Sequence, residues 1–173
     1  MPFIILGILA VVLLASTRSA GATGRPPVIH REILEAVNHW RQTVEDETQA
    51  RAHLTTPLVL AVIARESSGD ENAQGSDEDI GLMQITRPAW QDYQSATNDP
   101  ETAIFPDSMF VANLNVRVGG WFLNEKIDEM GNTFDGLRAY NAGTTRATRD
   151  PLISAGYAEW VTAHVAAFGA PIA

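Results

Sequence analysis

Residues 58–67 read LVLAVIARES, an apolar run that ends in a charged pair and a serine. The residues just before this run mark the start of a helix. Thr55 is a candidate N-cap, and Pro57 stands at the first helical position, where a missing amide hydrogen costs little. We therefore predict an apolar helix from Leu58 to about Ser67.

Glu66 stands near the end of this predicted helix, on the side that carries apolar residues. Val59, Val62 and Ile63 precede it by seven, four and three residues, which places them on the same helical face. The carboxyl group is thus expected at a buried edge, where desolvation disfavours its charged form and raises its pKa. A raised pKa suits a general acid near neutral pH. The alternative is a structural carboxylate that pairs with an arginine at the helix end.

The flanking sequence indicates further helices and no strongly alternating strand. Residues 28–52 carry apolar side chains at spacings of three and four, as one face of a helix requires. Residues 68–79 are polar and predict a loop, and residues 80–86 could hold a short extended piece. The other predicted helices run from Pro88 to about Ala96, from a cap at Asp107 to Met130 before Gly131, from Thr133 to Gly143, and onward from Asp150-Pro151. We predict one mainly α domain.

The composition bounds the class of protein. The 173 residues carry 21 acidic and 12 basic side chains, for a net charge of -9, so a nucleic-acid partner is not expected. The chain has no cysteine, which excludes disulfides, thiol catalysis and cysteine-ligated metals. Hydrophobic residues make up 45% of the chain, a share typical of a globular protein.

The N-terminal segment holds the longest apolar run. Residues 3–15 read FIILGILAVVLLA and would span roughly 20 Å as a helix, less than the roughly 30 Å of a bilayer core. This length fits a signal peptide, but no lysine or arginine precedes the run, which keeps an uncleaved membrane anchor open. We predict an N-terminal hydrophobic helix that serves as a signal peptide or membrane anchor within residues 1–22, a linker over 23–27 and the folded domain over 28–173.

A second motif follows Glu66 after fifteen residues, GLMQI at 81–85. Gly81 permits close approach of the backbone to a ligand. Met83 offers a soft apolar surface, and Gln84 carries both a donor and an acceptor that suit hydroxyl and acetamido groups. Taken by itself, the pentapeptide could equally be a turn followed by core residues.

A third motif, AYNAG, stands at 139–143. It places the phenol of Tyr140 and the carboxamide of Asn141 at a helix end, where both can point into a cleft. A packed tyrosine and an asparagine that caps the turn are the structural alternatives.

These three motifs, in this order and spacing, resemble the lytic transglycosylases of the soluble (SLT) type. Their lysozyme-like superfamily also contains goose-type lysozyme. The family pattern is a helix ending in Glu-Ser, here Glu66 and Ser67, then GLMQI, then AYNAG. The resemblance covers about residues 57–168 and implies a lysozyme-like helical fold.

Two weaker features support the resemblance. The family has an asparagine a few residues before a glycine in the intervening helix, and Asn115 and Gly119 match it here. A late aromatic helix beginning with Gly156 and Tyr157 also fits.

The resemblance implies a catalytic domain that cleaves the β-1,4 bond between N-acetylmuramic acid and N-acetylglucosamine in peptidoglycan, with no metal or other cofactor. Glu66 would protonate the glycosidic oxygen and then act as base on the muramic C6 hydroxyl, which closes a 1,6-anhydro ring. Tyr140 would hydrogen-bond near Glu66 and orient it. Gln84 and Asn141 would bind N-acetyl or hydroxyl groups. The floor of the glycan groove would be shaped by Ser67, Gly81 and Met83.

The loop that precedes GLMQI departs from the family pattern in two ways. The family often has a serine six residues before the glycine of GLMQI, where this chain has Gly75 followed by Ser76. The loop is also acidic, and Asp77 or Asp79 could be a second carboxylate that positions water, as in an inverting hydrolase. A solvated loop and a calcium site are the other interpretations.

Several functions stay in competition. The first is a lytic transglycosylase exported to the periplasm or cell envelope, or anchored to the membrane through residues 3–15. The second is a goose-type muramidase, such as a phage endolysin or virion lysozyme. The third is a non-catalytic glycan-binding or structural module on the same fold, against which the intact Glu66 argues. Envelope machinery and a phage virion are both conceivable partners of the enzyme.

Overall fold

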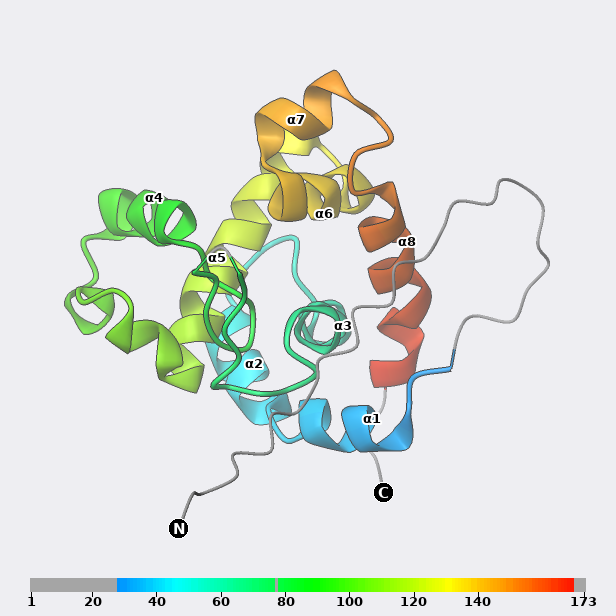
Figure 1. Ribbon diagram of the computed structural model, residues 1–173, viewed down its shortest axis with the longest axis horizontal. Coiled ribbons are helices and arrows are strands. Elements are labelled where there is room, and N and C mark those ends of the chain that lie inside the picture. The colour runs from blue at the N-terminus through cyan, green and yellow to red at the C-terminus, as the bar shows by residue number, and fades with distance from the viewer. Residues whose placement is uncertain (1–27, 77, 170–173) are drawn as a thin grey trace, which may run out of the picture.

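The computed structural model describes residues 28–76 and 78–169, which form a helical domain (Figure 1). The predicted signal or anchor over 1–22, with its hydrophobic run at 3–15, and the linker over 23–27 lie outside the described residues. Eight α-helices are present in the described part: α1 Arg31–Asn38, α2 Arg41–Thr48, α3 Thr56–Glu66, α4 Arg87–Thr97, α5 Ala112–Met130, α6 Thr133–Ala142, α7 Thr144–Arg149 and α8 Ala155–His164. Three short 3-10 helices join them: η1 Pro100–Thr102, η2 Asp107–Phe110 and η3 Val165–Phe168.

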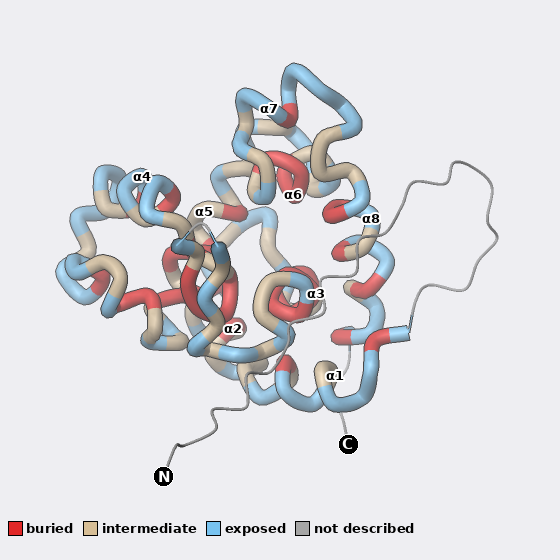
Figure 2. Tube along the Cα trace, in the orientation of Figure 1, coloured by how far each residue is buried: buried red, intermediate tan, exposed pale blue. Residues whose placement is uncertain are grey.

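The apolar helix α3 lies at the centre of the domain, as its composition predicts. Its residues from Leu58 to Ala64 are all buried, so it has no solvent-facing side until its last turn. Helices α1, α2, α8 and η3 surround it, and Figure 2 shows the buried residues gathered around α3 and α5. The predicted cap is confirmed, because the Thr55 side chain accepts a 3.4 Å hydrogen bond from the amide of Leu58.

Two predicted helix boundaries are wrong. The single helix expected over residues 28–52 is divided into α1 and α2, with a break at His39 and Trp40. The indole of Trp40 donates to the carbonyl of Gly69, a tertiary contact that helical periodicity does not report. Asp107 does not cap the long helix, because it begins the 3-10 turn η2, and α5 starts only at Ala112.

The C-terminal ends of two helices agree with the prediction. Gly131 follows α5 in the left-handed conformation with φ +75, and its amide bonds back to the carbonyl of Ile127 at 2.9 Å. Gly143 ends α6, although a further short helix, α7, follows at once.

No helix in the described part of the chain is both long and apolar enough to cross a bilayer.

An ion-pair cluster holds the α4 side of the domain to α2. Arg117 of α5 donates to Glu47 of α2 at 2.8 Å and to Asp99 at 3.3 Å. Asp99 also accepts a 2.8 Å hydrogen bond from the hydroxyl of Tyr93 in α4. The cluster therefore joins α2, α4, α5 and the segment that precedes η1.

The loop between α3 and α4 folds back on itself through isolated bridges. Gln74 pairs with Ile80, and Ile80 pairs with Ile85, so the short extended piece expected over residues 80–86 is present in reduced form. The amide of Gly81 bonds to the carbonyl of Ala73 at 2.8 Å, which closes the loop above the end of α3.

Candidate active site

Glu66 is the last residue of α3 and lies partly buried between this helix and α8. The hydroxyl of Tyr157, near the start of α8, donates a 2.6 Å hydrogen bond to its Oε1. Tyr157 is only 7% exposed, so this bond is sheltered from water. The helix end therefore presents one carboxyl group in a mostly apolar setting, held in place by one buried phenol.

The environment of Glu66 raises its pKa from the ordinary 4.5 to about 7. Burial is the main cause, since it disfavours the charged form. The hydrogen bond from Tyr157 and the charge of Arg65 lower the pKa, and the charge of Asp79 raises it. A carboxyl group with this pKa is present in both protonation states near neutral pH, so it can donate a proton and later accept one.

Tyr140 of α6 belongs to the same site but makes a different hydrogen bond. Its hydroxyl donates to the carbonyl oxygen of Met83 at 2.7 Å. Burial raises the pKa of the Tyr140 hydroxyl, and the charge of Glu66 raises it further. Tyr140 therefore lies near Glu66, as expected, while the direct hydrogen bond to the carboxyl group comes from Tyr157.

A buried asparagine holds the GLMQI loop in position. Asn115 of α5 is 0% exposed, and its Nδ2 donates to the carbonyls of Ile80 and Met109, each at 2.8 Å. Its Oδ1 accepts from the amide of Met83, also at 2.8 Å. All the hydrogen-bonding capacity of the amide nitrogen is used within the protein, so Asn115 clamps the loop to α5 and η2.

Gly81 is required by this clamp. It is buried and has φ +74, a conformation that other residues rarely adopt. A Cβ atom there would lie 2.4 Å from Nδ2 of Asn115 and 2.5 Å from the carbonyl oxygen of Met109. The close approach that we expected between Gly81 and a ligand is thus made by the protein itself.

The expectation that Met83 offers an apolar surface to a sugar is wrong. Its side chain is 0% exposed and packs on Gly119 of α5, where a Cβ atom would lie 2.6 Å from the Met83 sulfur. Only the backbone of Met83 faces the site, where its carbonyl oxygen accepts the hydrogen bond from the Tyr140 hydroxyl. The pairing of Met83 with Gly119 gives a packing reason for the glycine that follows Asn115 by four residues.

Ser67 and Gln84 join the loop to the end of α3. The Ser67 hydroxyl lies 2.9 Å from the carbonyl oxygen of Leu82 and 3.2 Å from the amide of Gly69. The side-chain amide of Gln84 donates to the carbonyls of Gly81 at 2.9 Å and Ala73 at 3.2 Å. Both side chains therefore shape the loop beside Glu66, and the Gln84 amide nitrogen is already engaged.

Asn141 lies farther out on α6. It is exposed, and its Oδ1 accepts a 2.7 Å hydrogen bond from the hydroxyl of Ser154. This contact ties the end of α6 to the turn before α8, the helix that carries Tyr157.

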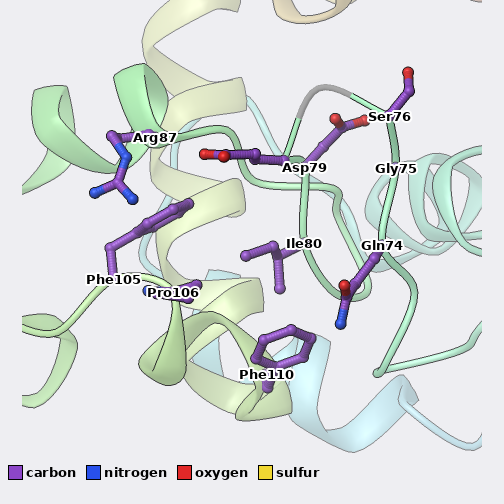
Figure 3. A pocket seen from close by; sticks show the side chains of 10 residues that line it. Gln74, Gly75, Ser76, Asp79, Ile80, Arg87, Phe105, Pro106 and Phe110 are labelled. Carbon is purple, nitrogen blue, oxygen red and sulfur yellow. The ribbon is translucent and has the colours of Figure 1, made fainter.

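Of the two expected second carboxylates, Asp79 is close enough to Glu66 for its charge to affect the pKa of that group. Asp77 lies outside the described residues. The carboxylate of Asp79 fills the space beside Gly75, because a Cβ atom at position 75 would lie 2.3 Å from its Oδ2. A larger residue at position 75 would require the Asp79 carboxylate to move (Figure 3). In the described part of the chain, no three His, Asp or Glu side chains gather in a way that could hold a metal ion.

Tyr157 is the residue that sequence reasoning missed as a partner of Glu66. The sequence marked it only as part of a late aromatic helix. The position of Tyr157 on its helix could have indicated this role. Tyr157, Ala158 and Val161 form the buried side of α8, which packs on α3. A tyrosine on the inner side of a helix needs a hydrogen-bond partner for its hydroxyl, and Glu66 is that partner.

A central apolar helix ending in a partly buried glutamate, faced by two tyrosines and a clamped loop, belongs to the lysozyme-like class of helical domains. More narrowly, the family described as Transglycosylase SLT domain matches residues 43–160, and the chain is a member of that family. Both the resemblance in the motifs and the mainly α, lysozyme-like fold class are thereby confirmed. Membership supports the expectation of an enzyme that acts on peptidoglycan.

Two solved structures share the fold. An inactive mutant of the lytic transglycosylase Slt from Pseudomonas aeruginosa matches with 20% sequence identity and a TM-score of 0.67. The 70 kDa soluble lytic transglycosylase Slt70 from Escherichia coli matches with 19% identity and the same TM-score. Each alignment covers 75% of this chain and 24% of the other, so the chain spans about a quarter of those proteins. No curated protein sequence matches the chain.

Proposed function

We propose that the chain is a lytic transglycosylase that cleaves the β-1,4 bond between N-acetylmuramic acid and N-acetylglucosamine. The observation that carries the proposal is the Glu66 carboxyl group, which burial holds at a pKa of about 7 and Tyr157 holds in one orientation. Family membership supplies the substrate class.

Glu66 acts twice in the proposed reaction. Its protonated carboxyl group gives the proton to the glycosidic oxygen as the bond from that oxygen to the muramic C1 breaks. The resulting carboxylate then takes the proton of the C6 hydroxyl, whose oxygen forms a bond to C1 and closes the 1,6-anhydro ring. Glu66 ends protonated, as it began, so the cycle needs no water and no cofactor. The substrate acetamido group assists at C1, where no carboxylate nucleophile is invoked.

The residues around Glu66 divide into those that hold it and those that can meet the sugar. Tyr157 stabilises the carboxylate between the two proton transfers, since a hydroxyl donor favours the charged form. Tyr140 and Ser67 hold the loop in place through backbone carbonyls. We assign contact with N-acetyl or hydroxyl groups to Gln84, through its carbonyl oxygen, and to Asn141.

A muramidase is the second candidate, and Asp79 favours it. An inverting hydrolase needs a second carboxylate that positions water opposite the acid, and the charge of Asp79 acts on Glu66. The same proximity serves the lytic reaction as well, because a nearby negative charge keeps the Glu66 carboxyl group protonated. The two reactions differ in their products, so product analysis separates them.

The decisive experiment is digestion of purified sacculi with the full chain, followed by mass spectrometry of the released muropeptides. Muramic ends of the 1,6-anhydro type are expected, and reducing ends would identify the muramidase instead. Glu66→Gln is the matched inactive control. A well-folded protein that releases nothing at any pH between 5 and 8 would identify a non-catalytic glycan-binding or structural module.

We further propose that the enzyme works in the periplasm or cell envelope. The apolar run at 3–15 supports export or anchoring, and the substrate is found there. Cell fractionation with N-terminal sequencing of the mature protein tests whether residues 1–22 are removed. Association with a phage virion or with envelope machinery stays a prediction, which purification of the intact particle or complex would test.

A further inference from the structure

A buried arginine lies on α6, immediately before the AYNAG motif. The side chain of Arg138 is only 4% exposed. Its Nη1 donates a 2.6 Å hydrogen bond to Oδ1 of Asp135, which lies one turn earlier in the same helix. Removal of a guanidinium from water costs free energy unless its donors are satisfied, so the other hydrogen bonds of Arg138 show what this residue holds in place.

Three further hydrogen bonds of Arg138 go to backbone carbonyls in the arch, residues 144–154, that connects α6 to α8. Nε donates to the carbonyl of Ile153 at 3.0 Å, and Nη2 donates to the carbonyls of Ala147 at 2.7 Å and of Asp150. Figure 1 shows the arch rising from α6 through α7 and returning to the start of α8. One guanidinium, with its fork of N–H donors, therefore binds the arch to α6 at three points.

The last of these three points lies next to the residue at which α8 begins. Ile153 precedes Ser154, the N-cap of α8, whose hydroxyl also donates to Oδ1 of Asn141 at 2.7 Å. Tyr157 stands three residues after Ser154, and its hydroxyl donates the 2.6 Å hydrogen bond to Glu66. A shift of the arch would therefore displace the Tyr157 hydroxyl, and a hydrogen bond weakens steeply when its geometry is lost.

Helix α6 thus carries Tyr140 directly and holds Tyr157 through the arch. We propose that Arg138 is a positioning residue for catalysis, which fixes the first turn of α8 and thereby the place of the Tyr157 hydroxyl beside Glu66. The inference rests on the proposed function, in which Glu66 is both the acid and the base. Arg138 acts through the backbone, because its hydrogen bonds in the described part of the chain go to Asp135 and to the arch.

The test is the substitution Arg138→Lys in the full chain. Lysine keeps the positive charge, but its compact ammonium group cannot reach three carbonyls and a carboxylate at once. The hydrogen bond from Tyr157 should weaken, so the basic limb of the kcat/KM profile should move to higher pH, as expected for Tyr157→Phe. We expect kcat/KM at pH 7 to fall about threefold, because the bond is weakened and not removed.

A double variant shows whether Arg138 acts through Tyr157. The other charged and titratable groups that interact with Glu66 stay unchanged in both substitutions; these are Arg65 on α3, Asp79 in the loop and Tyr140 on α6. In a Tyr157→Phe background, Arg138→Lys should not move the basic limb further, since the bond that it positions is absent. A limb that moves equally in both backgrounds, or that stays in place in Arg138→Lys alone, would overturn the inference.

The matched control is Arg117→Lys, the same substitution at another arginine that holds separate elements together. Arg117 of α5 bonds to Glu47 of α2 and to Asp99 before η1. Both variants should lower Tm, because each loses hydrogen bonds, but only Arg138→Lys should move the basic limb. An equal movement in Arg117→Lys would mean that the pH profile follows stability alone, and the positioning role would then be wrong.

The pKa of Glu66 in the free protein separates failure of this inference from failure of the proposed function. The carbon-13 chemical shift of the carboxyl group reports this pKa without any turnover. A higher pKa in Arg138→Lys than in the wild type supports the positioning role even if the chain cleaves no glycan, and an unchanged or lower pKa contradicts it. Should Arg138→Lys fail to fold, Asp135→Asn takes its place. This variant removes the partly exposed counter-charge of Arg138 and should raise the same pKa by a smaller amount, and an unchanged value there also contradicts the inference.

Discussion

The hydroxyl of Tyr157 and Oε1 of Glu66 are 2.6 Å apart, which joins the first turn of α8 to the last residue of α3. This bond opposes the effect of burial on the same carboxyl group. Burial favours the protonated form of Glu66, whereas the donated hydrogen bond favours the charged form. The balance leaves the carboxyl group able to change protonation state near neutral pH, and each contribution can be removed separately.

Removal of the Tyr157 hydroxyl should raise the pKa of Glu66 above 7. In Tyr157→Phe the carboxylate loses the donor that stabilises it, so the basic limb of the kcat/KM profile should move to higher pH. We also expect kcat/KM at pH 7 to fall about tenfold, because the carboxylate formed during the reaction is less stable. Tyr93→Phe is the control, since it removes a hydroxyl bonded to Asp99 away from Glu66. If the basic limb of the kcat/KM profile stays at the same pH in Tyr157→Phe, the assignment of Tyr157 as the residue that stabilises the Glu66 carboxylate is contradicted.

Replacement of Glu66 by glutamine should abolish turnover and change how stability depends on pH. Because burial raises the folded-state pKa above the unfolded value of 4.5, the folded chain binds the proton more tightly. The wild type should therefore lose stability as pH rises from about 4.5 to 7, on the order of 2 kcal/mol from this group. Glu66→Gln lacks that loss, so its melting temperature relative to the wild type should increase over this range. Thermal unfolding at pH 4.5 and 7.5 measures the difference, and a constant difference would contradict the raised pKa.

Neutralisation of Asp79 should lower the pKa of Glu66. The charge of Asp79 is one of the causes that raise this pKa, so Asp79→Asn should move the basic limb of the kcat/KM profile to lower pH. Glu78→Gln removes the same charge from the adjacent position and is not among the causes for Glu66, so the limb should stay in place. The carbon-13 chemical shift of the Glu66 carboxyl group measures the same pKa without substrate. Equal shifts in both variants would indicate a general effect of net charge.

Substitution of Gly81 by alanine should destabilise the domain. The new Cβ atom would meet the Asn115 amide and the Met109 carbonyl, and the backbone would have to keep φ +74. We expect a loss of about 2–4 kcal/mol in the free energy of unfolding, measured by urea denaturation. Gly156→Ala is the matched control, because no heavy atom lies within 4 Å of its added Cβ and its φ is not positive. If Gly81→Ala lowers the free energy of unfolding by less than about 1 kcal/mol, the GLMQI loop and Asn115 can rearrange around the new methyl group at little cost.

The sequence predicts the central helix well because its signals are local. Seven consecutive apolar residues, the Thr55 cap and a proline near the N-terminus all lie within a dozen positions, and each acts on the backbone next to it. The burial of the Glu66 side chain follows from the same helical face. The end of α5 at Gly131 is equally local, since it depends on one residue with a positive φ.

The parts that the sequence did not predict depend on long-range contacts. The side chain of Met83 is buried because Gly119, 36 positions away, leaves room for its sulfur. The break between α1 and α2 accompanies the hydrogen bond from Trp40 to Gly69. Tyr157 reaches Glu66 across 91 positions, and nothing near either residue indicates which of the two tyrosines will make that bond.

The Nδ2 atom of Asn115 occupies the volume in which a side chain at position 81 would begin. For anyone who wishes to re-engineer the specificity of this scaffold, the two positions behave as one unit, because a change at either alone meets a clash or leaves three backbone groups unpaired. A mutant library should therefore hold both constant. The positions to vary are instead Gln74, Ser76 and Arg87, whose exposed side chains line the pocket between the acidic loop and η2 (Figure 3).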